Sequence, residues 1–254
     1  ITGVNNDSGE NYLKDFDNVF VNACGIGFHK QLMSDQTLDI GFSATAMHYI
    51  SEKPCQILNH VHMVGASGSA LDAYSTQARD DWNRILLSRA AELKPGGRLV
   101  FMNFGIDEDG RYLGNTGGVN MFNTFNDIWN ELHEEKLITR DELVDATFSQ
   151  FYRTREEFCA PLVDSSSEVY QSGLRLISAH TNVVKCPYRA AYEKAGSTMS
   201  SQEFATSYIP TLRSWSETVF ATALDPDRPE NTRAALVDLF YQRYEDRVAA
   251  DPTG

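Results

Sequence analysis

The chain has 254 residues, of which 42% are hydrophobic, and it carries a formal net charge of −13 at pH 7. This length is sufficient for one large domain with a substantial core, and the acidic excess excludes a nucleic-acid surface, because phosphate binding needs a clustered basic footprint. No apolar run approaches the roughly 20 residues that span a bilayer, so we expect one cytoplasmic domain without membrane or nucleic-acid partners.

The first predicted elements are two short strands separated by a glycine turn. Val19 to Val21 is a short apolar run, and Gly25 and Gly27 favour a turn after it. Thr37 to Phe42 is predicted to form the second strand. The helical turn expected next contains residues 47–49, so this part of the chain leads from a strand into a Met-His-Tyr sequence.

A long helix and a buried strand are predicted next. Ile57 to Val64 is apolar and rich in β-branched residues, which favours a strand. Between Leu71 and Leu93 apolar residues recur at helical spacing, and Pro95-Gly96-Gly97 ends this helix. Arg98 to Phe104 then indicates a buried strand. This order is typical of the late βα units of a doubly wound sheet, and its alternative is any αβ crossover with a tight turn.

A polar loop and further helices follow the buried strand. The loop from Gly105 to Gly118 is rich in glycine and corresponds to the sheet edge where ligands usually bind. The apolar stripe from Val119 to Leu137 predicts a helix. Thr139 with Glu142 has the pattern of a capping box, which predicts that a short helix begins there, and another helix is expected from Thr154.

The last part of the chain is predicted to be mostly helical. Leu174 to Val184 alternates enough to favour one more strand. Apolar residues between Phe204 and Val219 recur every three or four positions, with a kink expected at Pro210. Asn231 is expected to cap a final helix. The whole pattern therefore indicates an α/β fold with added helices.

Conventional catalytic and metal-binding patterns are not recognisable in the sequence. Ser67 lies in GASGS, which lacks the G-x-S-x-G nucleophile elbow, and CGIGF is a weak match to a dinucleotide loop. His60 and His62 lack a partner at ligand spacing, so we expect a partly buried strand end and no metal. The four cysteines are widely separated, which indicates free thiols in a reducing compartment.

Three parts of the sequence resemble a known enzyme family. They are GFHKQL with SATAMHYIS, the long helix leading into LKPGGRLV, and the helix from Met121 through EEKLI. In this order they resemble the plant salicylic, jasmonic and theobromine type methyltransferases, the SABATH family, and their bacterial relatives. The resemblance covers nearly the whole chain from about Asn18. It implies an α/β fold with a class I methyltransferase Rossmann-like sheet, incomplete here, and a helical cap formed by approximately residues 106–172 and 185–254.

The resemblance also implies the cofactor S-adenosyl-L-methionine, whose methyl group the family transfers to a small carboxylic acid or a ring nitrogen. Gly27 and Phe28 match a Ser-Phe pair that touches the adenosine, so Phe28 keeps an aromatic wall while Gly27 lacks the hydroxyl. The family's glycine motif is not recognisable before Asn18, and its closing strand does not follow Gly254. We therefore expect residues 1–254 to form a single methyltransferase domain that lacks the N-terminal cofactor motif and binds the cofactor poorly.

Substrate-binding residues follow from the same resemblance. Thr45 matches a family tyrosine that lines the pocket, while His48 and Tyr49 match a pair whose second member, a tryptophan, donates a hydrogen bond to the substrate carboxylate. A phenol can donate as an indole does. Six more residues match positions that shape the acyl or aromatic part of the substrate: Phe104, Met121, Phe122, Phe151, Leu212 and Trp215. Ordinary packing in the core is the alternative role for these aromatic and apolar side chains.

Methyl transfer to a carboxylate needs little catalytic machinery. A sulfonium methyl group is already activated, and a carboxylate with a reference pKa of about 4 is already ionised, so positioning alone can contribute ~7–11 kcal/mol and no catalytic residue is expected. The sequence therefore predicts a methyltransferase acting on the carboxylate of a small, largely apolar acid. Nitrogen or phenol methylation, a non-catalytic binding relative and a nucleotide-dependent oxidoreductase are the alternatives, and a homodimer is compatible with the sequence.

Overall fold

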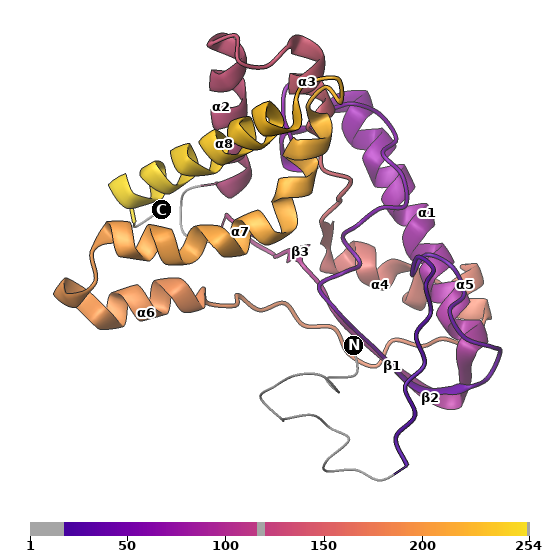
Figure 1. The fold of residues 1–254 in the computed structure, drawn as a ribbon. Coiled ribbons are helices and arrows are strands. Elements are labelled where there is room, and N and C mark those ends of the chain that lie inside the picture. The colour runs from indigo at the N-terminus through magenta and orange to yellow at the C-terminus, as the bar shows by residue number, and fades with distance from the viewer. Residues whose placement is uncertain (1–17, 116–119, 253–254) are drawn as a thin grey trace.

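The computed structural model describes residues 18–115 and 120–252 and shows a mixed α/β fold. A small sheet and the long helix α1 (Gly68–Glu92) lie on one side of the molecule in Figure 1, and a group of helices from the second half of the chain lies on the other. No helix within the described ranges combines the length and the apolar composition needed to cross a bilayer.

The sheet consists of two parallel strands, β1 (Leu38–Ala44) and β2 (Leu93–Met102), with α1 between them in the sequence. This confirms the expected strand, helix and strand. The second strand begins at Leu93 and not at the predicted Arg98, because Leu93 pairs with Leu38, and a register shift before Ile40 and Arg98 accommodates the Pro-Gly-Gly residues. The two strands form the described portion of a parallel sheet of the doubly wound kind.

One buried ion pair fixes the loop that carries Phe28. The Arg89 guanidinium donates from Nε to a carboxylate oxygen of Glu92 at 2.6 Å. It also donates to the carbonyl oxygens of Phe28 at 3.0 Å and Lys30 at 2.7 Å, while the Met33 N–H donates to Glu92 at 3.2 Å. The end of α1 therefore holds the segment of residues 28–33 at the sheet.

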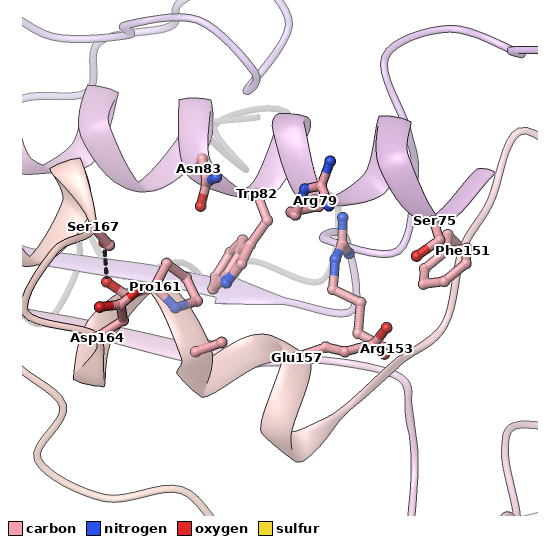
Figure 2. A pocket seen from close by; sticks show the side chains of 11 residues that line it. Ser75, Arg79, Trp82, Asn83, Phe151, Arg153, Glu157, Pro161, Asp164 and Ser167 are labelled. Carbon is pink, nitrogen blue, oxygen red and sulfur yellow. Dashed lines mark hydrogen bonds between the residues drawn. The ribbon is translucent and has the colours of Figure 1, made fainter. Parts of the chain in front are cut away.

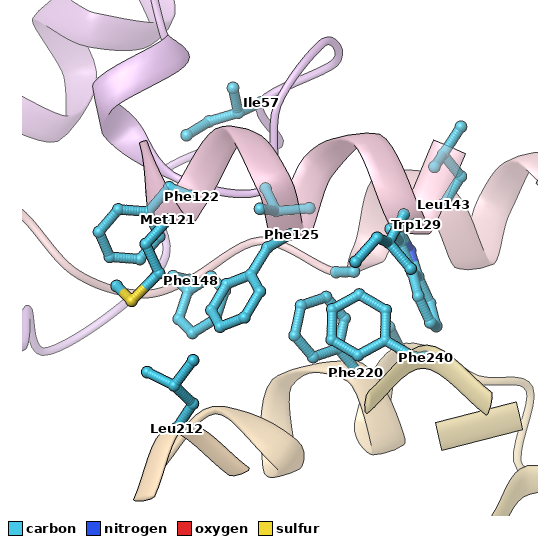
Figure 3. Close-up of a cluster of buried hydrophobic side chains, with 14 of the residues drawn as sticks. Ile57, Met121, Phe122, Phe125, Trp129, Leu143, Phe148, Leu212, Phe220 and Phe240 are labelled. Atoms are coloured by element: carbon cyan, nitrogen blue, oxygen red, sulfur yellow. The ribbon is translucent and has the colours of Figure 1, made fainter. Parts of the chain in front are cut away.

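A larger hydrophobic core joins the helices α2 (Met121–Glu134), α7 (Ser201–Ala223) and α8 (Glu230–Ala250). Figure 3 shows aromatic side chains of all three helices meeting in it. Phe125 is fully buried at its centre, and its ring lies 5.6 Å from that of Phe220 and 5.7 Å from that of Phe240, measured between centroids. The apolar stripes predicted for these helices are thus buried against one another.

Short elements connect the two regions. They are η2 (Met63–Gly65), β3 (Gly105–Ile106), α3 (Arg140–Asp145), β4 (Arg153–Thr154), α4 (Arg155–Val163), α5 (Glu168–Gln171), α6 (Pro187–Ala195) and η3 (Gly196–Thr198). β3 pairs in parallel with β4. The predicted capping box of Thr139 and Glu142 is confirmed, and it begins α3. The last helix begins at Glu230, so its predicted cap at Asn231 is wrong, because Pro229 is the preceding cap residue.

Three predicted strands are wrong. Val19 to Val21 has no strand partner within the described residues, and Phe20, the middle residue of this run, is 86% exposed. Leu174 to Val184 is likewise irregular and largely exposed. Ile57 to Val64 turns and enters η2, because its apolar side chains, including Ile57 and Val61, fill the helical core instead of lining a sheet. Apolar composition alone could not separate these two uses.

Candidate functional site

The turn after β1 carries three of the predicted substrate-binding residues. Thr45 has a positive φ of 53° and an exposed side chain, and its N–H donates to the carbonyl of Met102 at 2.6 Å. The chain then turns, with the N–H of Tyr49 donating to the carbonyl of Ala46 at 3.1 Å. The turn therefore begins at the end of both strands, where ligands usually bind in such sheets.

A distant segment of the chain fixes His48 and Tyr49. Tyr49 and Gln150 form an antiparallel bridge, and the N–H of Phe151 donates to the carbonyl of His48 at 2.8 Å. These backbone bonds hold the turn against residues 150–152. Sequence patterns could not reveal this pairing because it joins single residues across long sequence separation.

His48 lies in an aromatic environment. Its side chain is buried, and its ring centroid lies 4.3 Å from that of Tyr49, 5.1 Å from that of Phe104 and 5.8 Å from that of Tyr152. Burial, together with the smaller effect of the positive charge of Arg153, lowers the pKa of His48 to about 4. His48 is therefore a neutral imidazole at neutral pH.

The rings around Tyr152 continue into the helical core. The ring of Phe122 lies 5.9 Å from that of Tyr152 and 6.4 Å from that of Trp215. We call His48, Phe104, Phe122, Tyr152 and Trp215 the aromatic cluster. The structure thus brings together four of the residues predicted to bind substrate, and adds Tyr152.

The other predicted substrate-binding residues lie around this cluster. Met121 and Leu212 are buried in the same core, as Figure 3 shows beside Phe122. Phe151 also belongs to that core but lines a separate cavity. Tyr49 is 37% exposed, so this residue lies at the edge of the cluster and not in its centre. Thr45 is exposed at the strand end, away from these packed side chains.

The predicted cofactor residues lie on the opposite side of the same turn. Phe28 is half-buried, stacks on His29 with ring centroids 4.2 Å apart, and packs with Met47 in a second hydrophobic cluster. His29 is within hydrogen-bond distance of the carbonyl of Tyr49, at 3.2 Å. Gly27 is exposed, and a side chain there would meet no atom within 4 Å. Phe28 thus keeps part of its ring accessible beside the turn, whereas Gly27 shows no steric need for glycine.

Sequence reasoning missed Tyr152 of the aromatic cluster and two polar residues beside the cluster, His62 and Gln150. His62 is fully buried, and its ring stacks on that of Phe122 at 3.8 Å. Gln150 and Tyr152 belong to the segment that pairs with the turn. The His60-Val61-His62 sequence was the pattern that could have indicated a buried polar residue here. It was interpreted as a partly buried strand end, whereas the side chain of His62 is fully buried in the core.

A cavity of about 370 Å³ lies between α1 and α4. Of the residues predicted to bind substrate, Phe151 alone is among those that line it. Figure 2 shows Trp82 extending from α1 toward the helix on the other side of the cavity, α4. Its lining residues are Ser75, Arg79, Trp82, Asn83, Phe151, Arg153, Glu157, Ala160, Pro161, Asp164 and Ser167. The mixture of cationic, anionic and apolar side chains does not by itself indicate one ligand.

Arg153 connects this cavity to the turn. Its side chain is buried and donates to the carbonyl of Met47 at 2.6 Å and to the carbonyl of Ala78. Its guanidinium carbon lies 5.5 Å from the ring centroid of Phe158. Burial lowers the pKa of Arg153 to about 10, which leaves it charged at neutral pH. Arg153 therefore fastens the His48 turn to α1 and α4.

Trp215→Ala is expected to extend the acceptor range toward bulkier acids. Trp215 is half-buried and lies at the edge of the aromatic cluster, where its ring also packs against those of Phe125 and Phe148, so its removal opens space beside Phe122. Discrimination by a pocket wall is worth ~1–3 kcal/mol per methylene-sized change. The measurement is kcat/KM for a series of acids of increasing size.

The matched control for this change is Tyr192→Ala, which removes another half-buried ring that packs on Phe204 outside the aromatic cluster. It should leave the order of acceptor preference unchanged. Equal selectivity in the Trp215 variant and the wild type, with a similar loss of thermal stability in both variants, would assign Trp215 to the core only.

Comparisons with known proteins agree with this geometry. The family described as SAM dependent carboxyl methyltransferase matches residues 4–251 of the chain. Indole-3-acetate O-methyltransferase 1 of Arabidopsis thaliana is 28% identical over 131 residues, covering 45% of this chain and 32% of that protein. The chain thus spans about a third of that relative.

A solved structure shows that the fold is also shared. Loganic acid methyltransferase with SAH superposes with a TM-score of 0.67 and 15% sequence identity, covering 91% of this chain and 62% of that one. The class I fold predicted from the sequence is therefore confirmed, with two parallel strands and the connecting helix as its described sheet portion. Because the family match extends over nearly all of the sequence, the chain belongs to the SAM dependent carboxyl methyltransferase family, as its resemblance to the SABATH enzymes predicted.

Proposed function

We propose that the full-length protein transfers the methyl group of S-adenosyl-L-methionine to the carboxylate of a small, largely apolar acid. The observation that carries this proposal is the aromatic cluster around neutral His48, with Tyr49 at its edge and Phe28 on the other side of one turn. The names of the two relatives, which specify indole-3-acetate and loganic acid, support a carboxylic acid as the acceptor.

The residues of the chain would act by positioning. When bound, the cofactor supplies an electrophilic methyl group, and the acceptor carboxylate is already ionised at neutral pH. The cluster provides apolar walls that exclude water and orient the acid, while the hydroxyl of Tyr49 would donate a hydrogen bond to a carboxylate oxygen. Because His48 is neutral, it forms no ion pair with the carboxylate that would compete with the hydrogen bond from Tyr49.

Tyr49→Phe is expected to lower kcat/KM for an accepted acid by an amount equivalent to ~1.5–3 kcal/mol, the contribution of one hydrogen bond to a charged group. The substitution removes only the hydroxyl of a side chain that is 37% exposed, so thermal stability should change little. Steady-state kinetics with a single acid measures the effect. Wild-type kinetics in the variant would mean that Tyr49 only packs.

The proposed reaction is tested by incubating the full-length protein with methyl-labelled S-adenosylmethionine and a panel of small acids that includes indole-3-acetate. Mild base hydrolyses a carboxyl methyl ester and releases its labelled methyl group as methanol. We therefore expect a base-labile product. A base-stable product would instead indicate methylation of nitrogen or a phenol. Binding of the acid and of S-adenosylhomocysteine without any product would indicate the non-catalytic relative.

The cofactor preference is tested separately by calorimetry. We expect S-adenosylhomocysteine to bind with saturation and nicotinamide dinucleotides not to bind. The family is dependent on S-adenosylmethionine, which supports this expectation. Saturable dinucleotide binding without any binding of S-adenosylhomocysteine would overturn the proposed function. The single-domain organisation, the helical cap, the cytoplasmic location and the homodimer stay predictions.

A further inference from the structure

Several buried polar atoms in and beside the aromatic cluster have no hydrogen-bond partner within the described residues. They are Nδ1 of His48, Nε2 of His62, Oε1 of Gln150 and the hydroxyl of Tyr152. The most exposed of these four residues, His48, has only 3% of its surface accessible. Buried polar groups are nearly always paired in native proteins, so several unpaired groups at one place need an explanation.

The unpaired atoms belong to side chains that face one another. The ring centroid of Tyr152 lies 5.0 Å from that of His62 and 5.8 Å from that of His48. The side chain of Gln150 lies close enough to His62 for a hydrogen-bonding interaction that raises the pKa of His62, although Nε2 of His62 and Oε1 of Gln150 do not reach full hydrogen-bond geometry. Phe122 covers the other face of the His62 ring. These four buried polar atoms therefore lie close together within apolar surroundings, and we call them the polar surface.

The protonation of His62 determines what this surface can bind. Nδ1 of His62 accepts the N–H of Val64 at 3.3 Å, and burial keeps the pKa of the ring well below its ordinary value. The proton of the neutral ring is consequently on Nε2, which becomes an unpaired donor. The hydroxyl of Tyr152 can donate or accept, and the oxygen of Gln150 accepts. The surface thus combines donors and acceptors.

A hydroxyl group fits such a surface better than a second carboxylate. It accepts one hydrogen bond and donates one, whereas a carboxylate only accepts and would place a charge among neutral side chains. The nearest cation, Arg153, directs its terminal nitrogens to the carbonyls of Met47 and Ala78. The carboxylate is thus expected at the exposed edge, near Tyr49, and the hydroxyl at the buried end.

We infer that the acceptor acid carries a hydroxyl group remote from its carboxylate, and that His62, Gln150 and Tyr152 bind this hydroxyl. This inference rests on the proposed function, because it places the methylated carboxylate at Tyr49. The hydrogen bonds to this hydroxyl would select the acid in addition to the fit against the apolar walls. An acid without the hydroxyl would leave the buried donor and acceptors unpaired, which penalises its binding.

The test compares pairs of acids that differ by one hydroxyl: phenylacetate, 3-phenylpropanoate and indole-3-acetate with their ring-hydroxylated derivatives. Calorimetry with the full-length protein in the presence of S-adenosylhomocysteine measures their affinities. At least one hydroxylated acid should bind roughly ten- to a hundred-fold more tightly than its parent. Tyr152→Phe, which removes a single oxygen, should reduce this advantage to less than about three-fold, and His62→Phe should do the same.

The control is His133→Phe, the same change at a histidine that bonds to the carbonyl of Ile138 and lies outside the aromatic cluster. It should keep the full hydroxyl preference. If His62→Phe unfolds because the cap of η2 is lost, Tyr152→Phe still decides the question. The inference is overturned if the parent acids bind as tightly as the hydroxylated ones, if none of the hydroxylated acids binds, or if the preference survives in Tyr152→Phe.

Failure of the proposed function has a different signature. If hydroxylated acids bind preferentially but no methylated product forms, the methyl transfer is contradicted and the hydroxyl-binding role of Tyr152 and His62 is supported. If both members of every pair are methylated with equal kcat/KM and equal affinity, methyl transfer is supported and the hydroxyl-binding role is contradicted.

Discussion

Glu142→Ala is expected to lower the free energy of unfolding by about 3 kcal/mol, because several partly buried donors lose their common buried acceptor at once. The Glu142 carboxylate, with a side chain that is 3% exposed, accepts from Nε of Arg228 at 2.5 Å and from its Nη2 at 2.7 Å. It also accepts the N–H groups of Thr139 at 2.7 Å and Asp225 at 2.9 Å. Glu142 thus joins α3 to the loop between α7 and α8.

The same carboxylate gives stability a dependence on pH. Although burial acts in the opposite direction, the hydrogen bonds from Arg228 and the two N–H groups lower the pKa of Glu142 from 4.5 to about 2. A lowered pKa in the folded state stabilises the protein above the unfolded pKa, and this stabilisation is lost as the pH falls from about 4.5 toward 2. We expect it to contribute about 2–3 kcal/mol at neutral pH, since solvent near Arg228 screens part of the interaction.

Urea denaturation of the wild type and of Glu142→Ala at pH 7 and pH 3.5 measures both effects. The difference between the two proteins should be about 1 kcal/mol smaller at pH 3.5 than at pH 7. Glu135→Ala is the control, because Glu135 pairs with Arg243 at 2.7 Å on the exposed surface and should matter little. A difference that is independent of pH would contradict the assigned role of the Glu142 charge.

Arg153→Met is expected to lower the free energy of unfolding by about 3–5 kcal/mol as well, because the carbonyls of Met47 and Ala78 lose their donors in a buried environment. Methionine approximates the length of the arginine stem but donates no hydrogen bond. The loss should be measured by chemical denaturation at pH 7. Because the turn of His48 is fastened by this contact, KM for the acid should rise more than kcat falls.

A second measurement separates this account from a purely structural loss. The positive charge of Arg153 contributes to the low pKa of His48, so the pKa of His48 should rise in Arg153→Met, as followed by the NMR titration of its ring protons. Arg155→Met is the control, since Arg155 forms exposed ion pairs with Glu108 and Glu156. An unchanged pKa of His48 in a folded Arg153→Met protein would show that the two groups are not coupled.

The sequence allowed the helical part of the fold to be predicted because an amphipathic helix carries its signal within a few turns. The stripe of α2 and the capping box of Thr139 and Glu142 are local patterns, and both appear where expected. Strands depend on partners that are distant in the sequence. Val19 to Val21 and Leu174 to Val184 have strand-like composition but no pairing within the described residues, so local composition misled their prediction.

The candidate site could be predicted only in part. His48, Phe104, Phe122 and Trp215 followed from family resemblance, and the structure brings their rings together. Tyr152 was missed, although it links these rings, because its place depends on the pairing of Gln150 with Tyr49. The roles of His62 and Arg153 depend on which backbone groups they bond, and no periodic pattern contains that information.

The most direct test of the proposed site is a crystal structure of the full-length protein with S-adenosylhomocysteine and an acid that it binds. The account predicts a carboxylate oxygen within hydrogen-bond distance of the Tyr49 hydroxyl, the body of the acid against Phe104 and Trp215, and the adenine beside Phe28. An acid seated in the cavity between α1 and α4, against Trp82 and away from Tyr49, would contradict it.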